Sequence, residues 1–155
     1  MKSLLLALAP SLSMAALSSI SQNDVTGGGA CKPMTVLFAR GTTELGNMGS
    51  VAGPPFVTAL GAMMGGAANI AVQGIEYPAD IPGFLAGGSK AGSALMAKMV
   101  GQVRAQCPDT NLVMAGYSYV FIVSTSRTET NGCVGRAVSS FTMQQTCSHR
   151  RTQRL

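Results

Sequence analysis

The sequence predicts an α/β domain built on a parallel central sheet. Three apolar runs of strand length alternate with two segments of helical period, an order typical of parallel strands joined by right-handed crossovers. The third run ends at Gly116 and leads to Ser118, a pattern that suits a sharp strand-to-helix turn presenting a hydroxyl. At 155 residues the chain holds one domain at most, and with 46% apolar residues it can bury a core.

Residues 1–16 have the pattern of a secretory signal peptide. Lys2 supplies the positive start, residues 4–8 the apolar centre, and residues 13–16 an exit suited to cleavage. An amphipathic first helix of the domain fits this order of residues less well. The apolar run is too short for a transmembrane span, and so is every later one. We therefore expect a secreted, extracellular protein in which disulfides are permitted among its four cysteines.

Residues 17–30 are polar and rich in glycine, which predicts a flexible lead-in. Residues 34–39, M-T-V-L-F-A, predict a buried strand. Residues 40–47 then hold charges and hydroxyls at the carboxyl end of that strand, where open α/β sheets place their sites. An ordinary strand-to-helix connection has a similar composition, but the presence of Ser118 downstream favours a site.

The middle of the chain predicts a helix, a strand and a loop. Pro54 and Pro55 suit the first turn of a helix, and residues 70–75 form a second apolar run of strand length. Residues 79–88 are interrupted by proline and glycine and predict a loop. The expected apolar face of the helix consists of Phe56, Leu60 and Met63 or Met64.

Ser89 is a suitable N-cap for the longest predicted helix, residues 90–106. Its apolar side chains recur at every fourth residue, and residues 107–109 then stop it before the strand at residues 111–116. A nucleophile turn usually reads G-x-S-x-G, whereas Val120 occupies the position of the last glycine. The expected stripe of the helix is Ala91, Leu95, Met99 and Val103.

Four features together carry a family resemblance. They are Cys31 shortly before the first strand, A-R-G-T-T-E-L-G-N at residues 39–47, C-P-D-T at residues 107–110 and G-Y-S at residues 116–118. On these residues, the segment from Cys31 to Ser118 resembles the fungal cutinase family of secreted serine esterases. The resemblance implies part of an α/β-hydrolase-like, cutinase-type three-layer sandwich with parallel central strands. The N-terminal part of that domain would occupy residues 31–118, and its C-terminal half would be missing.

The resemblance also implies roles for four residues. Ser118 matches the nucleophile, and Thr42 matches the hydroxyl residue of the oxyanion hole. Cys31 and Cys107 match a disulfide pair, which would close a long loop. The implied substrates are cutin polyester and short acyl esters, cleaved by acyl transfer without a metal or cofactor. A monomer is expected.

The triad acid and base do not follow Ser118 in the expected form. Where the family reads G-Y-S-Q-G-G, Tyr119 follows Ser118, and the remaining chain holds only Glu129 as an acid and His149 as a histidine. No predicted strand and helix framework would bring these two residues together. The chain as written is therefore predicted to be inactive. The alternative is a noncatalytic secreted remnant that at most binds cutin or wax surfaces.

Residues 119–155 predict an irregular basic tail. Its five arginines are scattered and indicate no nucleic-acid partner, although they supply most of the net charge of +5. Permitted codons allow residues 119–134 to be a translated intron, followed by an out-of-frame exon that resumes as Q-G-G when it is reread from Gly135. A family member with a divergent tail is the alternative. The pairing of Cys133 and Cys147 stays open.

We expect the mature transcript to join the Ser118 codon directly to a Gln-Gly-Gly reading. A translated intron would explain why the apolar period of the sequence ends near this codon. Sequencing the transcript across the Ser118 codon measures this directly. A message that encodes residues 119–155 as written would contradict the intron hypothesis and leave the divergent tail.

Overall fold

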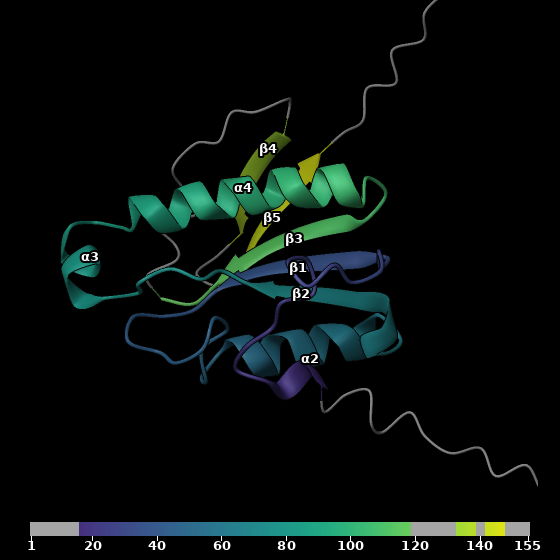
Figure 1. The fold of residues 1–155 in the computed structure, drawn as a ribbon, viewed down its shortest axis with the longest axis horizontal. Helices are drawn as coiled ribbons and strands as arrows, with labels where there is room; N and C mark the ends of the chain where they lie inside the picture. The colour runs from purple at the N-terminus through teal and green to yellow at the C-terminus, as the bar shows by residue number, and fades with distance from the viewer. Residues whose placement is uncertain (1–15, 119–132, 139–141, 148–155) are drawn as a thin grey trace, which may run out of the picture.

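A five-stranded sheet forms the centre of the molecule (Figure 1). Its strands lie in the order β2 (Ile70–Gly74), β1 (Met34–Ala39), β3 (Asn111–Gly116), β5 (Thr142–Cys147) and β4 (Cys133–Val138). The computed structural model describes residues 16–118, 133–138 and 142–147. The three predicted strands are confirmed, and they run parallel. They are β1 (Met34–Ala39), β2 (Ile70–Gly74) and β3 (Asn111–Gly116).

β1 lies between β2 and β3 and packs against a helix on each face. Val36 and Phe38 belong to one core cluster with α2 (Gly53–Met63), whereas Leu37 and Ala39 belong to another with α4 (Lys90–Gln106). Successive side chains of a strand point to opposite faces of its sheet. The alternation therefore places one helix layer on each side, as Figure 1 shows, and the predicted three-layer arrangement is confirmed.

The buried face of α2 differs by about one residue from the predicted face. Val57 and Gly61 are its innermost residues, while Met63 is 83% exposed. Leu17 packs closely against Gly61, because a methyl group added there would lie 2.5 Å from Leu17 Cδ1. The glycine at this position thus lets Leu17, in the segment before β1, reach the core. The apolar period of α2 did not predict this contact. Phe56 and Leu60 are partly buried beside this cluster.

α4 begins and ends where the sequence predicts, with Ser89 Oγ accepting a hydrogen bond of 3.0 Å from Gly92 N. Its buried stripe is shifted, since Ala91 is exposed. A spacing of four residues drifts around a helix of 3.6 residues per turn, so the contact face alternates spacings of four and three. The buried residues are Gly92, Met96, Met99 and Val103.

The prediction of a loop at residues 79–88 is wrong in part, because α3 (Ile81–Leu85) lies within it. Asp80 caps this short helix, its Oδ1 accepting a hydrogen bond of 2.8 Å from Gly83 N. A 3₁₀ turn, η2 (Ala67–Asn69), precedes β2, and another, η1 (Ala16–Ser18), begins the described chain. Among the described residues, no helix is long and apolar enough to cross a membrane.

The sequence predicts a flexible lead-in for residues 17–30, but residues 22–26 of this leading segment lie along the outer edge of β2. Gly74 N donates to Gln22 O at 2.9 Å, and Asp24 N donates to Val72 O at 3.0 Å. Asp24 Oδ2 in turn accepts a hydrogen bond of 2.8 Å from Val72 N. This leading segment therefore pairs groups that an open strand edge would leave exposed. Composition alone does not reveal this, because the partners are far apart in the chain.

The segment that the sequence predicts to be an irregular tail contains two described strands. β4 (Cys133–Val138) and β5 (Thr142–Cys147) pair antiparallel, with Cys133 opposite Cys147 in the register. β5 also pairs antiparallel with β3 at two positions, Met114 with Met143 and Ala115 with Thr142. The second edge of β3 is therefore partly covered by backbone of the same chain.

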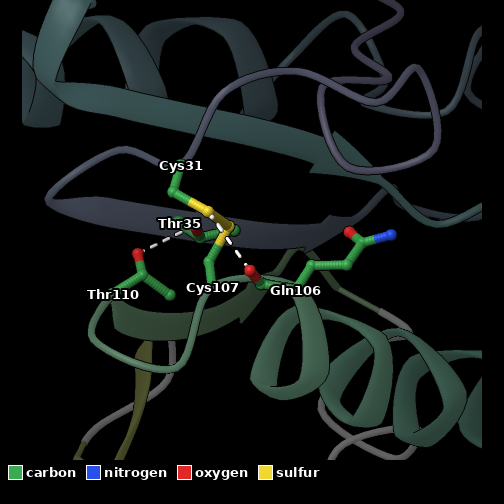
Figure 2. Close-up of a disulfide and its surroundings, with 5 residues drawn as sticks. All are labelled: Cys31, Thr35, Gln106, Cys107 and Thr110. Carbon is green, nitrogen blue, oxygen red and sulfur yellow. Dashed lines mark hydrogen bonds between the residues drawn. A yellow bond between two sulfur atoms is a disulfide. The ribbon is translucent and has the colours of Figure 1, made fainter.

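A disulfide between Cys31 and Cys107 ties the start of β1 to the end of α4 (Figure 2). The Cα atoms lie 5.5 Å apart, and the two residues are separated by 76 positions. Nearby, the hydroxyls of Thr35 and Thr110 lie 2.9 Å apart in a buried hydrogen bond, and Cys31 Sγ contacts Gln106 O at 3.4 Å. The pairing implied by the family resemblance is thus confirmed.

Removing the disulfide by Cys31→Ser together with Cys107→Ser should lower the free energy of unfolding by about 4 kcal/mol, because a long loop of the unfolded chain is released. Denaturant unfolding of the double variant and the unchanged protein, both without reductant, measures the difference. Adding reductant to the unchanged protein should reproduce the loss. A change below about 1 kcal/mol would show that the cross-link contributes little to stability.

Candidate active site

The residues after β1 and β3 leave the sheet side by side. Ala39 pairs with Gly116 in the parallel register, and Tyr117 N donates a hydrogen bond of 3.1 Å to Ala39 O. The Tyr117 ring then packs on Gly41, where an added methyl group would lie 2.8 Å from its Cδ1. The sheet therefore brings the segments that carry Thr42 and Ser118 to the same carboxyl edge.

Ser118 has the backbone conformation expected of a nucleophile turn. Its φ is +58°, in the left-handed region that non-glycine residues rarely adopt, and its side chain is exposed. Such a conformation costs roughly 1–2 kcal/mol and persists only where the surrounding structure holds it. Tyr119 and Val120, which the sequence places after the turn, lie outside the described residues.

Thr42 presents a buried hydroxyl without a partner. Among the described residues, Thr42 Oγ1 and Arg40 Nη1 are the two buried side-chain polar atoms that make no hydrogen bond. A buried polar atom in this state is uncommon and costly, and it often marks a functional position. The donor of the Thr42 hydroxyl is therefore unused among the described residues.

Arg40 anchors the segment that follows β1. Its side chain is 8% exposed, its Nη2 donates to Tyr77 O at 2.7 Å, and its Nε donates to Glu44 O at 2.9 Å. The guanidinium also lies over the Tyr77 ring, 5.3 Å from the ring centroid. Its Nη1 lies 3.9 Å from Glu76 Oε1, an exposed carboxylate. Arg40 is thus part of the scaffold of the site.

The carboxylate of Glu44 closes residues 40–51, which we name the Thr42 loop. Its Oε2 accepts a hydrogen bond of 2.6 Å from Gly41 N, while its Oε1 accepts from Ser50 N at 2.9 Å and from Val51 N at 2.8 Å. Gly49, with φ of +73°, lies against this carboxylate. Sequence reasoning did not identify this role for Glu44, because its partners include two amides six and seven residues away.

Asn47 joins the Thr42 loop to the leading segment. Its Oδ1 accepts a hydrogen bond of 2.9 Å from Gln22 N, and its Nδ2 donates to Gln22 O at 3.2 Å and to Asn23 Oδ1 at 2.8 Å. Asn47 is 3% exposed, and Gly74 of β2 allows it to approach closely. The Asn47 side chain therefore links the Thr42 loop to the residues that lie along the outer edge of β2.

The structure brings Ser118 and Thr42 to one edge, whereas Glu129 and His149 lie outside the described residues. A surface cavity of about 400 Å³ lies at the amino ends of β1 and β2, beside Leu17, Lys32 and Ile70. It does not belong to this site. Exposed apolar side chains occur in the Thr42 loop and on α3. They are Leu45, Val51, Ile81, Phe84 and Leu85.

Known proteins are similar to this chain in sequence and in fold. The sequence model of the family described as Cutinase matches residues 30–148. A cutinase of Botryotinia fuckeliana is 54% identical over 89 residues, which cover 57% of this chain and 44% of the relative. Cutinase 4 of Emericella nidulans is 50% identical over 101 residues, covering 64% of this chain and 44% of the relative. The chain therefore spans less than half the length of these curated relatives.

A solved structure agrees with the sequence matches. Trichoderma reesei cutinase in complex with a phosphonate inhibitor has a TM-score of 0.59 to this chain and 33% sequence identity. The likeness covers 74% of this chain and 54% of that one. This likeness supports the partial α/β-hydrolase-like fold.

Asn47→Ala should lower the free energy of unfolding by about 3 kcal/mol, because it removes three hydrogen bonds from a buried junction. Asn69→Ala is the matched control, since Asn69 makes one hydrogen bond of 2.9 Å to Met64 O and is only partly buried. That control should lose about 1 kcal/mol or less. Denaturant unfolding of both variants compares them, and equal losses would contradict the junction described for Asn47.

Proposed function

Because the chain belongs to the cutinase family, we propose that it carries the nucleophile half of a secreted, cutinase-type carboxylic ester hydrolase. The substrates would be cutin polyester and short acyl esters. The observation that carries the proposal is the left-handed backbone of Ser118 beside a loop whose Thr42 hydroxyl is buried and unpartnered. A nucleophile and an oxyanion donor at one sheet edge are the two groups that ester cleavage needs first.

The reaction would proceed by acyl transfer through Ser118. Its Oγ attacks the ester carbonyl carbon while a base takes the hydroxyl proton, and the Thr42 hydroxyl donates a hydrogen bond to the oxyanion. The bond to the alcohol then breaks, and the alcohol leaves with a proton. Water hydrolyses the acyl-serine and restores Ser118. Each step needs a base or an acid beside the two described groups.

The chain as written does not supply the triad base and its orienting acid within a predicted strand and helix framework. His149 and Glu129 are the only histidine and acid after Ser118, and no predicted framework unites them. We therefore propose that this 155-residue chain has no ester-hydrolysing activity, or very little, as written. An external base could replace the missing histidine in a single chemical step.

Two assays test this proposal. The purified chain should hydrolyse p-nitrophenyl butyrate no faster than Ser118→Ala. With imidazole as the base, Ser118 should react with a p-nitrophenyl alkylphosphonate, releasing p-nitrophenolate and leaving a phosphonyl group that intact mass detects. Thr42→Val should slow this labelling about tenfold, since it removes the oxyanion donor, whereas Thr58→Val, which removes a hydroxyl on α2, should not.

The outcomes separate the parts of the proposal. Butyrate hydrolysis that disappears in Ser118→Ala would contradict the predicted inactivity. Labelling that persists in Ser118→Ala would refute Ser118 as the nucleophile. Equal labelling of Thr42→Val and the unchanged chain would remove Thr42 from the oxyanion site.

Secretion is proposed on two observations. Residues 1–16 have the order of a signal peptide, and the Cys31–Cys107 disulfide suits an oxidising compartment. We further propose that the chain is a monomer without a nucleic-acid partner.

A noncatalytic role on cutin or wax is the second candidate, and the exposed apolar residues of α3 favour it. Ile81, Phe84 and Leu85 are 56%, 48% and 77% exposed. The chain should then be retained on cutin particles without releasing acids, and Phe84→Ser with Leu85→Ser should release it. Met63→Ser, which changes an exposed apolar residue of α2, is the control. Unchanged retention in the α3 variant would refute this role.

A further inference from the structure

The Thr42 loop is held open around one hydroxyl by bonds to its backbone on both sides. Gly41 N, immediately before Thr42, donates to the Glu44 carboxylate at 2.6 Å. Thr43 N, immediately after it, donates to Ala79 O at 2.8 Å. Both flanking amides are thus hydrogen-bonded, while the Thr42 hydroxyl has no hydrogen-bond partner among the described residues. These bonds fix the backbone on both sides of Thr42 and leave its hydroxyl unpaired among the described residues.

We infer that Glu44 is a positioning residue that aims the Thr42 hydroxyl at the oxyanion of the reacting ester. This inference rests on the proposed function of Thr42 and adds a residue to it. Glu44 does not touch the reacting atoms, because both of its oxygens are occupied by backbone amides. It acts through the shape of the loop that it closes.

The chemistry of the carboxylate explains why glutamate suits this position. Three N–H donors, from Gly41, Ser50 and Val51, converge on two oxygens, and bonds to a charged acceptor are stronger than neutral ones. A glutamine has one acceptor oxygen, and its NH₂ would face an N–H donor in place of the other. We call the contacts of the Glu44 carboxylate with Gly41, Ser50 and Val51 the Glu44 clamp. Glu44→Gln keeps the size of the side chain and removes the acceptor on one side of this clamp.

The fit of the loop to the carboxylate is close. A methyl group added at Gly49 would lie 2.6 Å from Glu44 Cδ, and the φ of Gly49 is +73°. Gly49→Ala would therefore displace the carboxylate while leaving Glu44 unchanged. This variant disturbs the same clamp from its other side and gives an independent test.

The first experiment measures backbone hydrogen exchange of the full chain, residue by residue. In Glu44→Gln, the amides that then face the NH₂ group, either Gly41 or both Ser50 and Val51, should exchange about tenfold faster or more, because they lose their acceptor. Amides of β1, such as Val36 and Leu37, should not change. Glu76→Gln is the matched control, since Glu76 is an exposed glutamate near the same loop.

The second experiment asks whether Glu44 acts through Thr42. Labelling of Ser118 by the phosphonate, with imidazole as the base, should slow about tenfold in Glu44→Gln when Thr42 is present. In a Thr42→Val background the same change should slow labelling less than about twofold. Glu44→Asp, which keeps both oxygens on a shorter side chain, should recover part of the rate, and Gly49→Ala should resemble Glu44→Gln.

Unchanged exchange at Gly41, Ser50 and Val51 in Glu44→Gln would overturn the inference. So would an equal loss of labelling rate with Thr42 present and in the Thr42→Val background, since Glu44 would then act independently of the hydroxyl. Failure of the unchanged chain to react at Ser118 would instead count against the proposed function. In that case the exchange measurement still decides whether Glu44 holds the loop.

Discussion

The parallel pairing of β1 with β3 determines where every group of the candidate site lies. Its register sets Ala39 opposite Gly116, so that the chain leaves both strands at one edge of the sheet. The same register directs Leu37 toward α4 and Phe38 toward α2. A slip of one residue would exchange these faces. The core and the approach of Thr42 to Ser118 therefore depend on one set of backbone hydrogen bonds.

Beyond the sheet, polar contacts between distant segments give the Thr42 loop its shape. Glu44 collects amides from the two ends of the loop, and Arg40 reaches the carbonyl of Tyr77. Asn47 adds a bond to the leading segment along β2. These bonds order the loop together with Met48, whose side chain is fully buried in the core cluster that contains Val57. They also connect the candidate site to both the sheet edge and the segment before α3.

Two energetically unfavourable features lie at the carboxyl ends of β1 and β3. Ser118 is held in a left-handed conformation, and the Thr42 hydroxyl is buried without a partner. Neither improves the stability of the fold, and both persist because the strands and the Glu44 clamp hold the backbone around them. Features of this kind concentrate where a protein binds or reacts, which is why these two residues carry more weight than the exposed side chains near them.

The sequence by itself determined the three parallel strands, the extent of α4, and the candidate residue Ser118, since period, caps and short motifs depend on near neighbours. Resemblance to a family added Thr42 and the disulfide. Only the tertiary structure decided that α3 forms, that residues 22–26 cover the edge of β2, and that Glu44 binds the two ends of its loop. These features arise from contacts such as that of Asp24 with Val72, which lie 48 positions apart in the sequence. Local sequence patterns cannot predict contacts at such a separation.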